Sequence, residues 1–305
     1  MSFQLTILGS NSATPAFGRH PTSQLLRVAN YYFLIDCGEG CQMQLARYHL
    51  RASRVTHILI SHLHGDHFFG LIGLLNTLSL SGRERPLTIY GPTGLDDVLT
   101  VQFRASRTVL NYPIRFISLE AQAPEIIFED DLLTITALPV QHRIPCWGFL
   151  FREKPKLRRI NKEKLSPELS VEEMIALKHG KDILAPDGSV RFQNEKMTLP
   201  PRKSRSYAYC ADTRYFKQLS EWVQGVDLLY HETTFMDNER ALAESRYHST
   251  TVQAAILAKH AQAEMLLIGH FSSRYRDLTP LLEEAKTVFS NTALAIEGQD
   301  FTIQE

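Results

Sequence analysis

Short apolar runs recur along the chain and predict β-strands. Residues 3–8, 24–28 and 31–35 combine leucine with β-branched and aromatic side chains, which favour extended backbone. Only Ala29 and Asn30 separate the last two runs, so these runs are expected to form a hairpin. Further strands are expected at residues 56–60, 87–90, 114–118, 132–138, 148–151, 206–209, 228–230, 265–268 and 292–296.

Longer segments with a helical pattern lie between these strands. The segment 67–80 is apolar almost throughout, which predicts a buried helix. Strand clusters interleaved with single helices indicate an α/β fold, in which two sheets pack together and helices cover their outer faces. The other helices are expected at residues 38–48, 94–107, 215–223, 251–260 and 279–289.

Residues 152–205 interrupt the regular spacing of the strands. Charged residues, prolines and glycines are frequent in this stretch, and connections of this length are usually functional or disordered. Its first part, residues 152–164, carries a local charge excess of 7 − 2 = +5. Such a patch can bind phosphates by counterion release without reading a base sequence. The basic residues are Arg152, Lys154, Lys156, Arg158, Arg159, Lys162 and Lys164.

Composition narrows the class of protein. The chain has 305 residues, 44% of them hydrophobic, and 33 basic against 33 acidic residues, so affinity for nucleic acid must come from local patches. The first residues lack a basic stretch leading into an apolar segment, and residues 68–80 are too short to span a bilayer. A soluble, cytoplasmic enzyme with no membrane partner is therefore expected. The four cysteines form no C-x-x-C pair, which argues against a disulfide framework or a zinc finger.

The sharpest motif is Ser61-His62-Leu63-His64-Gly65-Asp66-His67, which follows the strand expected at 56–60. Side chains at the end of a strand are presented in a loop, and Gly65 allows a tight turn there. Three imidazoles and a carboxylate brought together in this way suit Zn²⁺ better than the harder cations Mg²⁺ and Ca²⁺. The motif therefore predicts a zinc site.

At this motif the sequence resembles the metallo-β-lactamase superfamily and, within it, the ribonuclease Z family. Residues 61–75, SHLHGDHFFGLIGLL, are similar to that family's signature, and further matching segments follow in the same order along the chain. They are residues 140–148 with His142, residues 210–214 with Asp212, residues 231–235, His248-Ser249-Thr250, and residues 270–275, HFSSRY. The resemblance implies a four-layer αβ/βα sandwich formed by residues 1–305, with a flexible arm inserted at 152–205.

The resemblance also implies a role for individual polar residues. His62, His64 and His142 would hold one zinc ion, Asp66, His67 and His270 a second, and Asp212 would bridge the two. Asp66 would in addition orient the attacking zinc-bound hydroxide and receive its proton. His248 would be the general acid, oriented by Glu232, and Arg274 would neutralise a phosphate oxygen.

The implied activity is removal of the 3′ trailer from precursor tRNA, which leaves a 3′-hydroxyl on the tRNA and a 5′-phosphate on the trailer. The arm, through Lys154, Lys156, Arg158 and Arg159, would grip the tRNA elbow, and in a homodimer the arm of one subunit would present the tRNA to the other's active site. Phe17 and His20 stand where the family often has Lys and Asn, whereas Arg19 is retained and expected to be free to bind a phosphate. The arm also lacks the adjacent Gly-Pro pair often found in the family.

Three other functions are compatible with parts of the pattern. A general zinc phosphodiesterase needs the same ligands, and so does a thioester or lactone hydrolase, because the ligands alone do not choose between carbon and phosphorus centres. The arm, the HFSSRY segment and His248 argue against the thioester or lactone reaction. An RNA-binding module with a structural zinc is disfavoured because a structural site would be closed by Cys or His without a bridging carboxylate such as Asp212.

Overall fold

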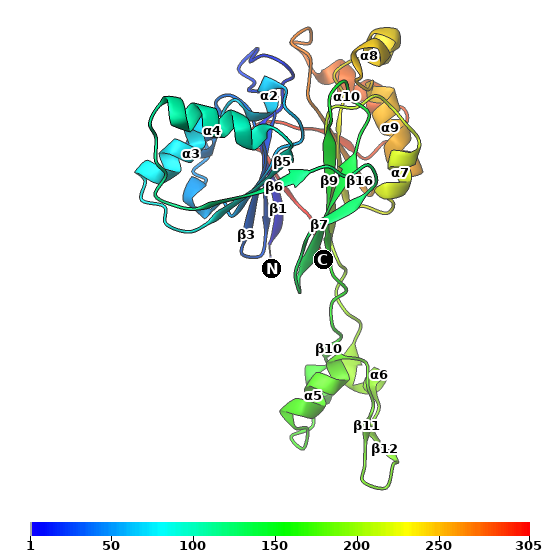
Figure 1. Ribbon diagram of the computed structural model, residues 1–305. Helices are drawn as coiled ribbons and strands as arrows, with labels where there is room; N and C mark the ends of the chain where they lie inside the picture. Colours follow the sequence, from blue (N-terminus) through cyan, green and yellow to red (C-terminus); the bar gives the residue numbers. More distant parts are fainter. Residues whose placement is uncertain (1) are drawn as a thin grey trace.

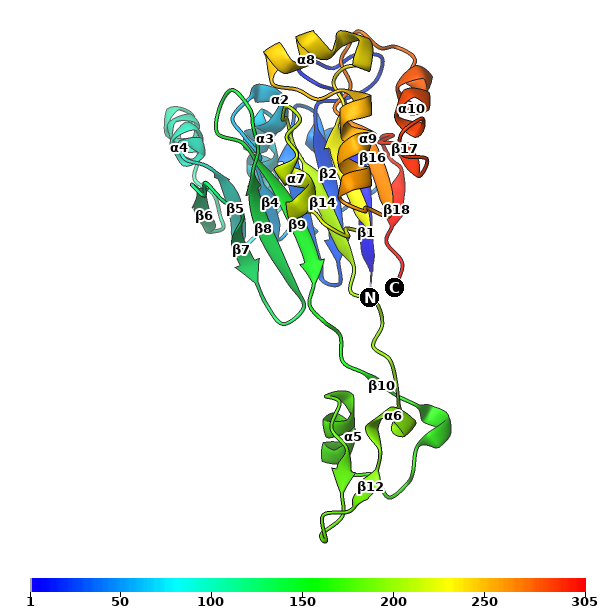
Figure 2. The same ribbon diagram turned by 90° about the vertical axis from the view of Figure 1, so that its right-hand side faces the viewer.

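Two seven-stranded sheets pack face to face in the computed structural model, which describes residues 2–305, and helices cover the outer face of each sheet (Figures 1 and 2). The first sheet has the order β18-β1-β2-β3-β4-β5-β6. It pairs antiparallel from β18 to β3 and parallel from β3 to β6. Its strands are β1 (Phe3–Gly9), β2 (Ser23–Val28), β3 (Tyr31–Cys37), β4 (His57–Leu59), β5 (Leu87–Pro92), β6 (Ile114–Leu119) and β18 (Asp300–Thr302).

The second sheet has the order β17-β16-β15-β14-β9-β8-β7. Strands β14 to β17 are parallel, whereas β7, β8, β9 and β14 pair antiparallel. Its strands are β7 (Glu125–Glu129), β8 (Leu133–Pro139), β9 (Trp147–Glu153), β14 (Ser206–Cys210), β15 (Leu228–Glu232), β16 (Met265–Gly269) and β17 (Thr292–Leu294).

The helices form the two outer layers, and Figure 1 shows α3 and α4 on one side of the sheets and α7, α9 and α10 on the other. The first sequence half contributes α1 (Cys41–Arg47), η1 (Ala52–Arg54), α2 (Gly65–Phe68), α3 (Leu71–Leu80) and α4 (Leu95–Ala105). The second contributes α7 (Gln218–Trp222), η3 (Asp237–Glu239), α8 (Arg240–Arg246), α9 (Thr251–His260) and α10 (Thr279–Lys286). Among residues 2–305, no helix has the length and apolar character needed to cross a membrane.

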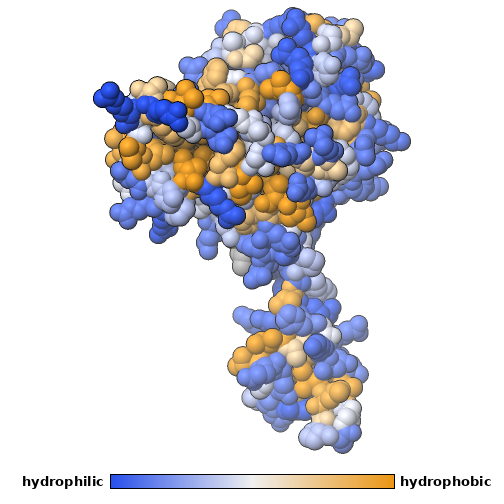
Figure 3. Space-filling model, in the orientation of Figure 1, coloured by the Kyte–Doolittle hydropathy of each residue, from blue (hydrophilic) through white to orange (hydrophobic). Residues whose placement is uncertain are grey.

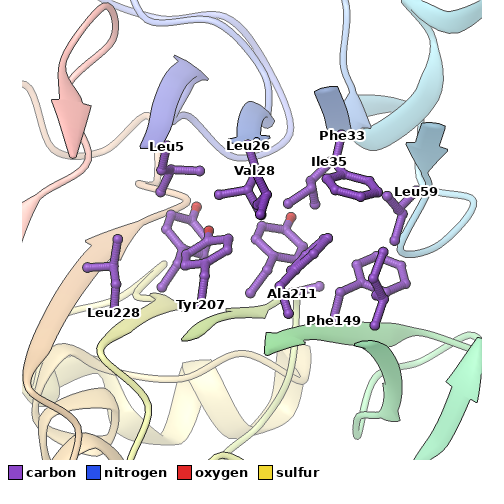
Figure 4. Packing of buried hydrophobic residues seen from close by; sticks show 14 of the residues in the cluster. Leu5, Leu26, Val28, Phe33, Ile35, Leu59, Phe149, Tyr207, Ala211 and Leu228 are labelled. Carbon is purple, nitrogen blue, oxygen red and sulfur yellow. The ribbon is translucent and has the colours of Figure 1, made fainter. Parts of the chain in front are cut away.

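Three hydrophobic clusters hold the four layers together. The central cluster lies between the sheets, where Leu5, Phe33 and Leu59 of the first face Phe149 and Tyr207 of the second (Figure 4). The second cluster packs the first sheet against α1, α3 and α4, and the third packs the other sheet against α7, α9 and α10. The layered α/β sandwich expected from the hydrophobic pattern is therefore confirmed.

Every strand expected from the sequence overlaps an observed strand, but β7, β18 and α8 of the body were not expected. Strands β7 and β18 lie at sheet edges, and β7 is mostly exposed, so neither has a strong hydrophobic pattern. Helix α8 is short and polar, with only Ala243 buried. The single helix expected at 67–80 is divided into α2 and α3. Gly70, between them, packs so closely on the backbone of Gly38 that a side chain would clash.

The inserted segment folds around a small core of its own and projects from the body (Figures 1 and 3). Leu169, Leu177, Ile183 and Met197 are its buried residues, and a capping box between Ser170 and Glu173 begins its main helix. It is thus a folded arm rather than an irregular loop. Its elements are β10 (Arg159–Ile160), η2 (Lys162–Lys164), α5 (Val171–Lys178), β11 (Ile183–Leu184), β12 (Val190–Phe192), α6 (Asn194–Met197) and β13 (Thr198–Leu199).

Both ends of the expected insertion belong to the body. Arg152 lies within β9, and Arg205 is buried, with its guanidinium bonded to Glu153 at 2.6 and 3.0 Å. Two chain segments, here called the stalk, connect the arm to the body. Glu305 forms ion pairs with Lys156 on one of these segments and with Arg202 on the other. The chain therefore leaves the body after Lys156 and returns to it at Arg202, and the residues between them form the arm.

Candidate metal centre and catalytic cleft

The residues expected to bind metal all lie at or just beyond strand ends at one edge of the two sheets. His62 and His64 follow β4, and Asp66 and His67 lie in α2, which begins in the same turn. His142, Asp212 and His270 follow β8, β14 and β16 in the other sheet. Because these strands end together, the seven side chains converge although up to 208 positions separate them in the sequence, from 62 to 270.

Within the described residues, the side chains form a first group of His62, His64, His142 and Asp212 and a second group of Asp66, His67 and His270, and Asp212 also clusters with His248 and His270. In the first group, His64 Nδ1 lies 3.0 Å from His62 Nε2 and 3.1 Å from His142 Nε2. In the second, His67 Nε2 lies 3.4 Å from His270 Nε2 and 3.6 Å from Asp66 Oδ2. Asp212 directs Oδ2 to His62 at 3.7 Å and Oδ1 to His270 at 3.1 Å. One carboxylate therefore faces both groups, as a bridging ligand must.

These residues fit a pair of divalent metal ions. Four of the imidazoles turn one nitrogen to the cluster and have the other held by the protein, as metal-binding histidines usually do. Asp212 Oδ1 is buried and has no hydrogen-bond partner within residues 2–305. The outer contacts are Ser61 Oγ for His62 (3.0 Å), Asp36 Oδ2 for His67 (2.7 Å), Tyr247 O for His142 (3.1 Å) and Thr234 Oγ1 for His270 (2.9 Å).

The ionisation of the first group also favours a metal ion. Burial lowers the pKa of His62, His64 and His142, so these imidazoles remain neutral at physiological pH. Neutral imidazole is the form that coordinates a metal. A set of five imidazoles and two carboxylates is a donor set typical of zinc.

Asp36 is a residue that the sequence reasoning missed. It is fully buried at the end of β3, its backbone adopts φ 54°, and its carboxylate accepts from the Ser61 amide (2.7 Å) and from the Tyr209 hydroxyl. The same carboxylate lies 2.7 Å from Nδ1 of His67 and so orients that imidazole. Its position directly after a buried strand, at the edge that carries the histidines, was the signal available in the sequence.

Glu232 and His248 form a second polar unit beside the metal residues. Glu232 is fully buried and lies 3.0 Å from His248 Nδ1, and its Oε1 also accepts from the Ser249 amide at 2.9 Å. Burial lowers the pKa of His248, but the charges of Glu232 and Asp212 outweigh burial and raise it to about 9. The carboxylate of Glu232, which holds Nδ1, therefore favours the protonated form of His248, and this residue lines the cleft over the metal residues.

A cleft of about 690 Å³ lies over this centre and is lined by Asp66, Asp212, His248 and His270. Arg274, expected to bind phosphate, lines it as well and is 54% exposed, although it also pairs with Glu239 at 2.6 Å. Two further arginines line the cleft and were not singled out from the sequence, Arg143 next to His142 and Arg246 in α8. Arg246 was missed because its helix was not expected.

Arg19 corrects one expectation. Its guanidinium donates to Asn11 Oδ1 at 2.9 Å, to the Tyr275 carbonyl at 2.6 Å and to the Arg276 carbonyl at 3.3 Å. Burial also lowers its pKa. Arg19 therefore ties the N-terminal loop to the segment after His270, and its guanidinium is engaged with protein groups rather than wholly free for a phosphate.

The basic residues of the arm divide into two sets. Lys154 pairs with Glu129 at 2.8 Å, and Lys156 pairs with Glu153 and Glu305, each at 2.9 Å, so both stalk lysines are already neutralised by the body. Arg158 and Arg159 lie beyond the stalk, where with Lys162 and Lys178 they border a groove of about 610 Å³. Residues 157–201, beyond the stalk, contain eight basic and seven acidic residues, a net charge of 8 − 7 = +1. The excess of basic residues at 152–164 is therefore not part of one continuous basic patch.

Fold and centre together define a metallo-β-lactamase-fold protein with a cluster of candidate metal ligands, and comparisons with known proteins agree. A ribonuclease Z of Cytophaga hutchinsonii is 48% identical over 305 residues, which are 100% of this chain and 97% of that protein. A ribonuclease Z of Bacteroides fragilis is 44% identical over 297 residues, 97% of each chain. The chain belongs to the ribonuclease Z family.

Solved structures and a family model give a consistent result. The human tRNase Z, short form, superposes with a TM-score of 0.71 at 29% identity and covers 99% of this chain and 100% of that one. The metallo-β-lactamase fold protein YhfI of Bacillus subtilis superposes with a TM-score of 0.69 at 22% identity, 99% and 100% covered, and shows the fold alone. A family model described as anti-Pycsar protein Apyc1 matches residues 3–106, which contain the histidine motif of the first sheet.

Proposed function

We propose that this chain removes the 3′ trailer from precursor tRNA by hydrolysing one phosphodiester bond. The observation that carries the proposal is the placement of two features in one cleft. One is a carboxylate, Asp212, that faces both groups of candidate metal ligands, and the other is an imidazole, His248, held by the buried carboxylate of Glu232. Phosphodiester hydrolysis needs a nucleophile on one side of phosphorus and a proton donor for the departing oxygen on the other.

In this proposal the cofactor is a pair of zinc ions. His62, His64 and His142 would hold one ion, Asp66, His67 and His270 the other, and Asp212 both. When bound, two zinc ions at such a centre generate a nucleophile from water at neutral pH and offset the charge of the phosphate. The identity and number of the metal ions are part of the proposal.

The side chains around this centre move the protons. The Ala13 amide donates to Oδ2 of Asp66 at 2.7 Å, so Asp66 is an oriented carboxylate, which is proposed to orient the attacking water and to receive its proton. His248 Nε2 donates its proton to the departing ribose O3′. The products are a tRNA with a 3′-hydroxyl and a trailer with a 5′-phosphate.

The arm is proposed to grip the tRNA at a distance from the cut. Its groove combines Arg158, Arg159 and Lys178 with the apolar side chains of Met174 and Ile175, so it can pair with phosphates and pack against bases or riboses. The stalk residues Lys154 and Lys156 are engaged in ion pairs and contribute less. The grip is therefore assigned mainly to Arg158 and Arg159.

The position of the arm favours a homodimer. Trp147, at the start of β9, bonds to the Ser61 carbonyl beside the histidine motif, whereas Glu153, at the end of β9, stands at the arm base. The six residue steps from Trp147 to Glu153 cover about 20 Å along the strand, which separates the arm base from the histidine motif. Figure 1 shows the arm at the end of the body opposite α2 and α8, so a tRNA held by one arm is better placed for the site of a second copy. A tRNA substrate also implies work in the cytoplasm.

The proposed reaction is tested by incubating the purified protein with precursor tRNA and zinc and mapping both product ends. The expected result is one cut that leaves the stated termini. A protein that leaves precursor tRNA intact but hydrolyses thioesters or lactones would overturn the proposal.

The proposed dimer is tested by mixing two inactive chains. One carries Asp212→Ala and keeps its arm, and the other lacks residues 157–201 and keeps its metal residues. If one subunit presents tRNA to the other, the mixture recovers up to about a quarter of the normal activity, since half of randomly paired chains are mixed dimers with one working site. A mixture as inactive as its components would reject presentation between subunits.

A further inference from the structure

A second pocket, here called the base pocket, lies next to the catalytic cleft, and His64 lines both. Its volume is about 600 Å³, and the loops after β4, β5, β6 and β8 surround it. Its walls are apolar and its rim is polar. The walls are formed by Leu63, Pro92, Leu119, Ile144, Pro145 and Trp147, and the rim by Thr93, Glu120 and Gln122.

We infer that the base pocket receives one nucleobase of the RNA, from a nucleotide next to the phosphate that is cut. This inference rests on the proposed function, because it takes RNA as the substrate. Apolar walls with a polar rim suit a nucleobase, which has flat faces that stack and an edge that forms hydrogen bonds. The pocket is large enough for a base with part of its ribose.

Neighbouring lining residues of the two cavities place this nucleotide. Arg143 lines the catalytic cleft and the next residue, Ile144, lines the base pocket. Arg143 is exposed, and its guanidinium lies 3.5 Å from His64 Nε2, the imidazole nitrogen that does not face the other histidines. When Arg143 binds the phosphate of a nucleotide, the base of that nucleotide can therefore turn past His64 and enter the base pocket.

Trp147 provides a rigid wall for this base. Its indole N–H donates to the Ala121 carbonyl at 3.1 Å, and only 4% of the residue is exposed. A side chain held in this way loses little conformational entropy when a base packs against it.

Glu120 gives the base pocket a preference among bases. Thr93 Oγ1 donates to Glu120 Oε1 at 3.3 Å and lies 2.8 Å from Ser118 Oγ, so the carboxylate is oriented at the rim. A carboxylate only accepts hydrogen bonds, and cytosine offers an amino group where uracil offers a carbonyl oxygen. The base pocket is therefore selective for cytosine over uracil.

The test uses precursor tRNAs in which each nucleotide flanking the cut is changed singly between cytosine and uracil. Single-turnover cleavage by the intact protein is expected to be about tenfold faster with cytosine at one of these positions, as for a hydrogen bond to a charged acceptor. In Glu120→Ala that ratio should fall to about one. Glu125→Ala, an exposed carboxylate on β7 outside the base pocket, is the matched control and should keep the ratio.

A ratio of one at every position in the intact protein, or an unchanged ratio in Glu120→Ala, would overturn the inference while leaving trailer removal intact. Ile144→Trp, which fills the base pocket, should also abolish the ratio. If this variant instead changes the oligomeric state in gel filtration, the base pocket is an interface between copies and the inference is wrong. An intact protein that cuts none of the precursors would reject the proposed function and the base pocket together.

Discussion

Glu232 determines the ionisation of His248 and so links one buried carboxylate to the proposed chemistry. Oε1 of Glu232 accepts from the amides of Thr213 and Ser249 and Oε2 from that of Thr234, so the carboxylate cannot rotate away from the imidazole. The charge of Glu232 raises the pKa of this imidazole, against the effect of burial, to about 9, and the hydrogen bond to Nδ1 fixes the orientation of the ring. This arrangement suits a general acid for a poor leaving group such as ribose O3′.

The variant His248→Ala tests this role. Cleavage of precursor tRNA should slow by about 10²- to 10⁴-fold, the usual contribution of a general acid, whereas a diester with a nitrophenol leaving group should slow little because that group needs no proton. His260→Ala, an exposed histidine at the end of α9, is the matched control. Equal slowing of both substrates with metal still bound would assign His248 to phosphate positioning instead.

His57 is a partly buried histidine at the start of β4 that takes no part in the proposed chemistry, and it affects stability. Its imidazole packs against the rings of Tyr31, Phe33, Tyr90 and Phe128, and burial lowers its pKa to about 4 despite the opposing charge of Asp130. The unfolded chain binds a proton here below about pH 6.5 and the folded chain only below about pH 4. The contribution of His57 to the free energy of unfolding is therefore fully present above pH 6.5 and decreases as the pH falls towards 4.

We expect His57→Phe to remove this pH dependence. Between pH 7 and pH 5 the free energy of unfolding of the intact protein should fall by about 2 kcal/mol more than that of the variant. Urea unfolding at the two pH values measures the difference. Parallel decreases in both proteins would show that His57 does not contribute.

At the scale of elements, the arm is separable from the body. Its core consists of its own residues, and the buried Glu153–Arg205 pair closes the body beneath it. A Gly/Ser link in place of residues 157–201 should therefore leave the sandwich folded, retain the metal centre and preserve hydrolysis of a small chromogenic diester. Cleavage of precursor tRNA should decrease strongly, because the phosphate contacts far from the cut are lost.

A milder change within the arm gives the control for this prediction. Reversing the charge of Arg158 and Arg159 should weaken tRNA binding and flatten its salt dependence without moving the cut. The same reversal at Lys181 and Lys196, exposed arm lysines that do not line the groove, should have a smaller effect. Normal tRNA cleavage by the arm-deleted protein would show that the arm is not the grip.

At the scale of the whole molecule, both sheets must pack correctly to complete the metal centre. Elemental analysis should find about two zinc ions per chain, and Asp212→Ala should lose at least one and abolish cleavage, because its carboxylate faces both groups. Cys37→Ser, a buried cysteine that belongs to neither group, should retain the normal metal content. A metal-free protein with full activity would reject the dinuclear centre.

The sequence alone predicted the features that depend on neighbouring residues. The apolar runs located the strands of both sheets except the edge strands β7 and β18, whose residues are too exposed to show a pattern. The contiguous motif from His62 to His67 was recognisable because its residues lie within one turn. The distant histidines, His142 and His270, were assigned through the family resemblance, since an isolated histidine has no local signal.

Only the tertiary structure decided the features that depend on contacts between distant segments. It directed the two oxygens of Asp212 to different groups, placed Asp36 behind His67, and engaged Arg19 with carbonyls more than 250 positions away. It also put the arm at the opposite end of β9 from the metal centre, and it neutralised Lys156 with the last residue, Glu305. The physical reason is that a side chain's direction and partners follow from how the two sheets pack, whereas the pattern along the chain records only which residues are buried.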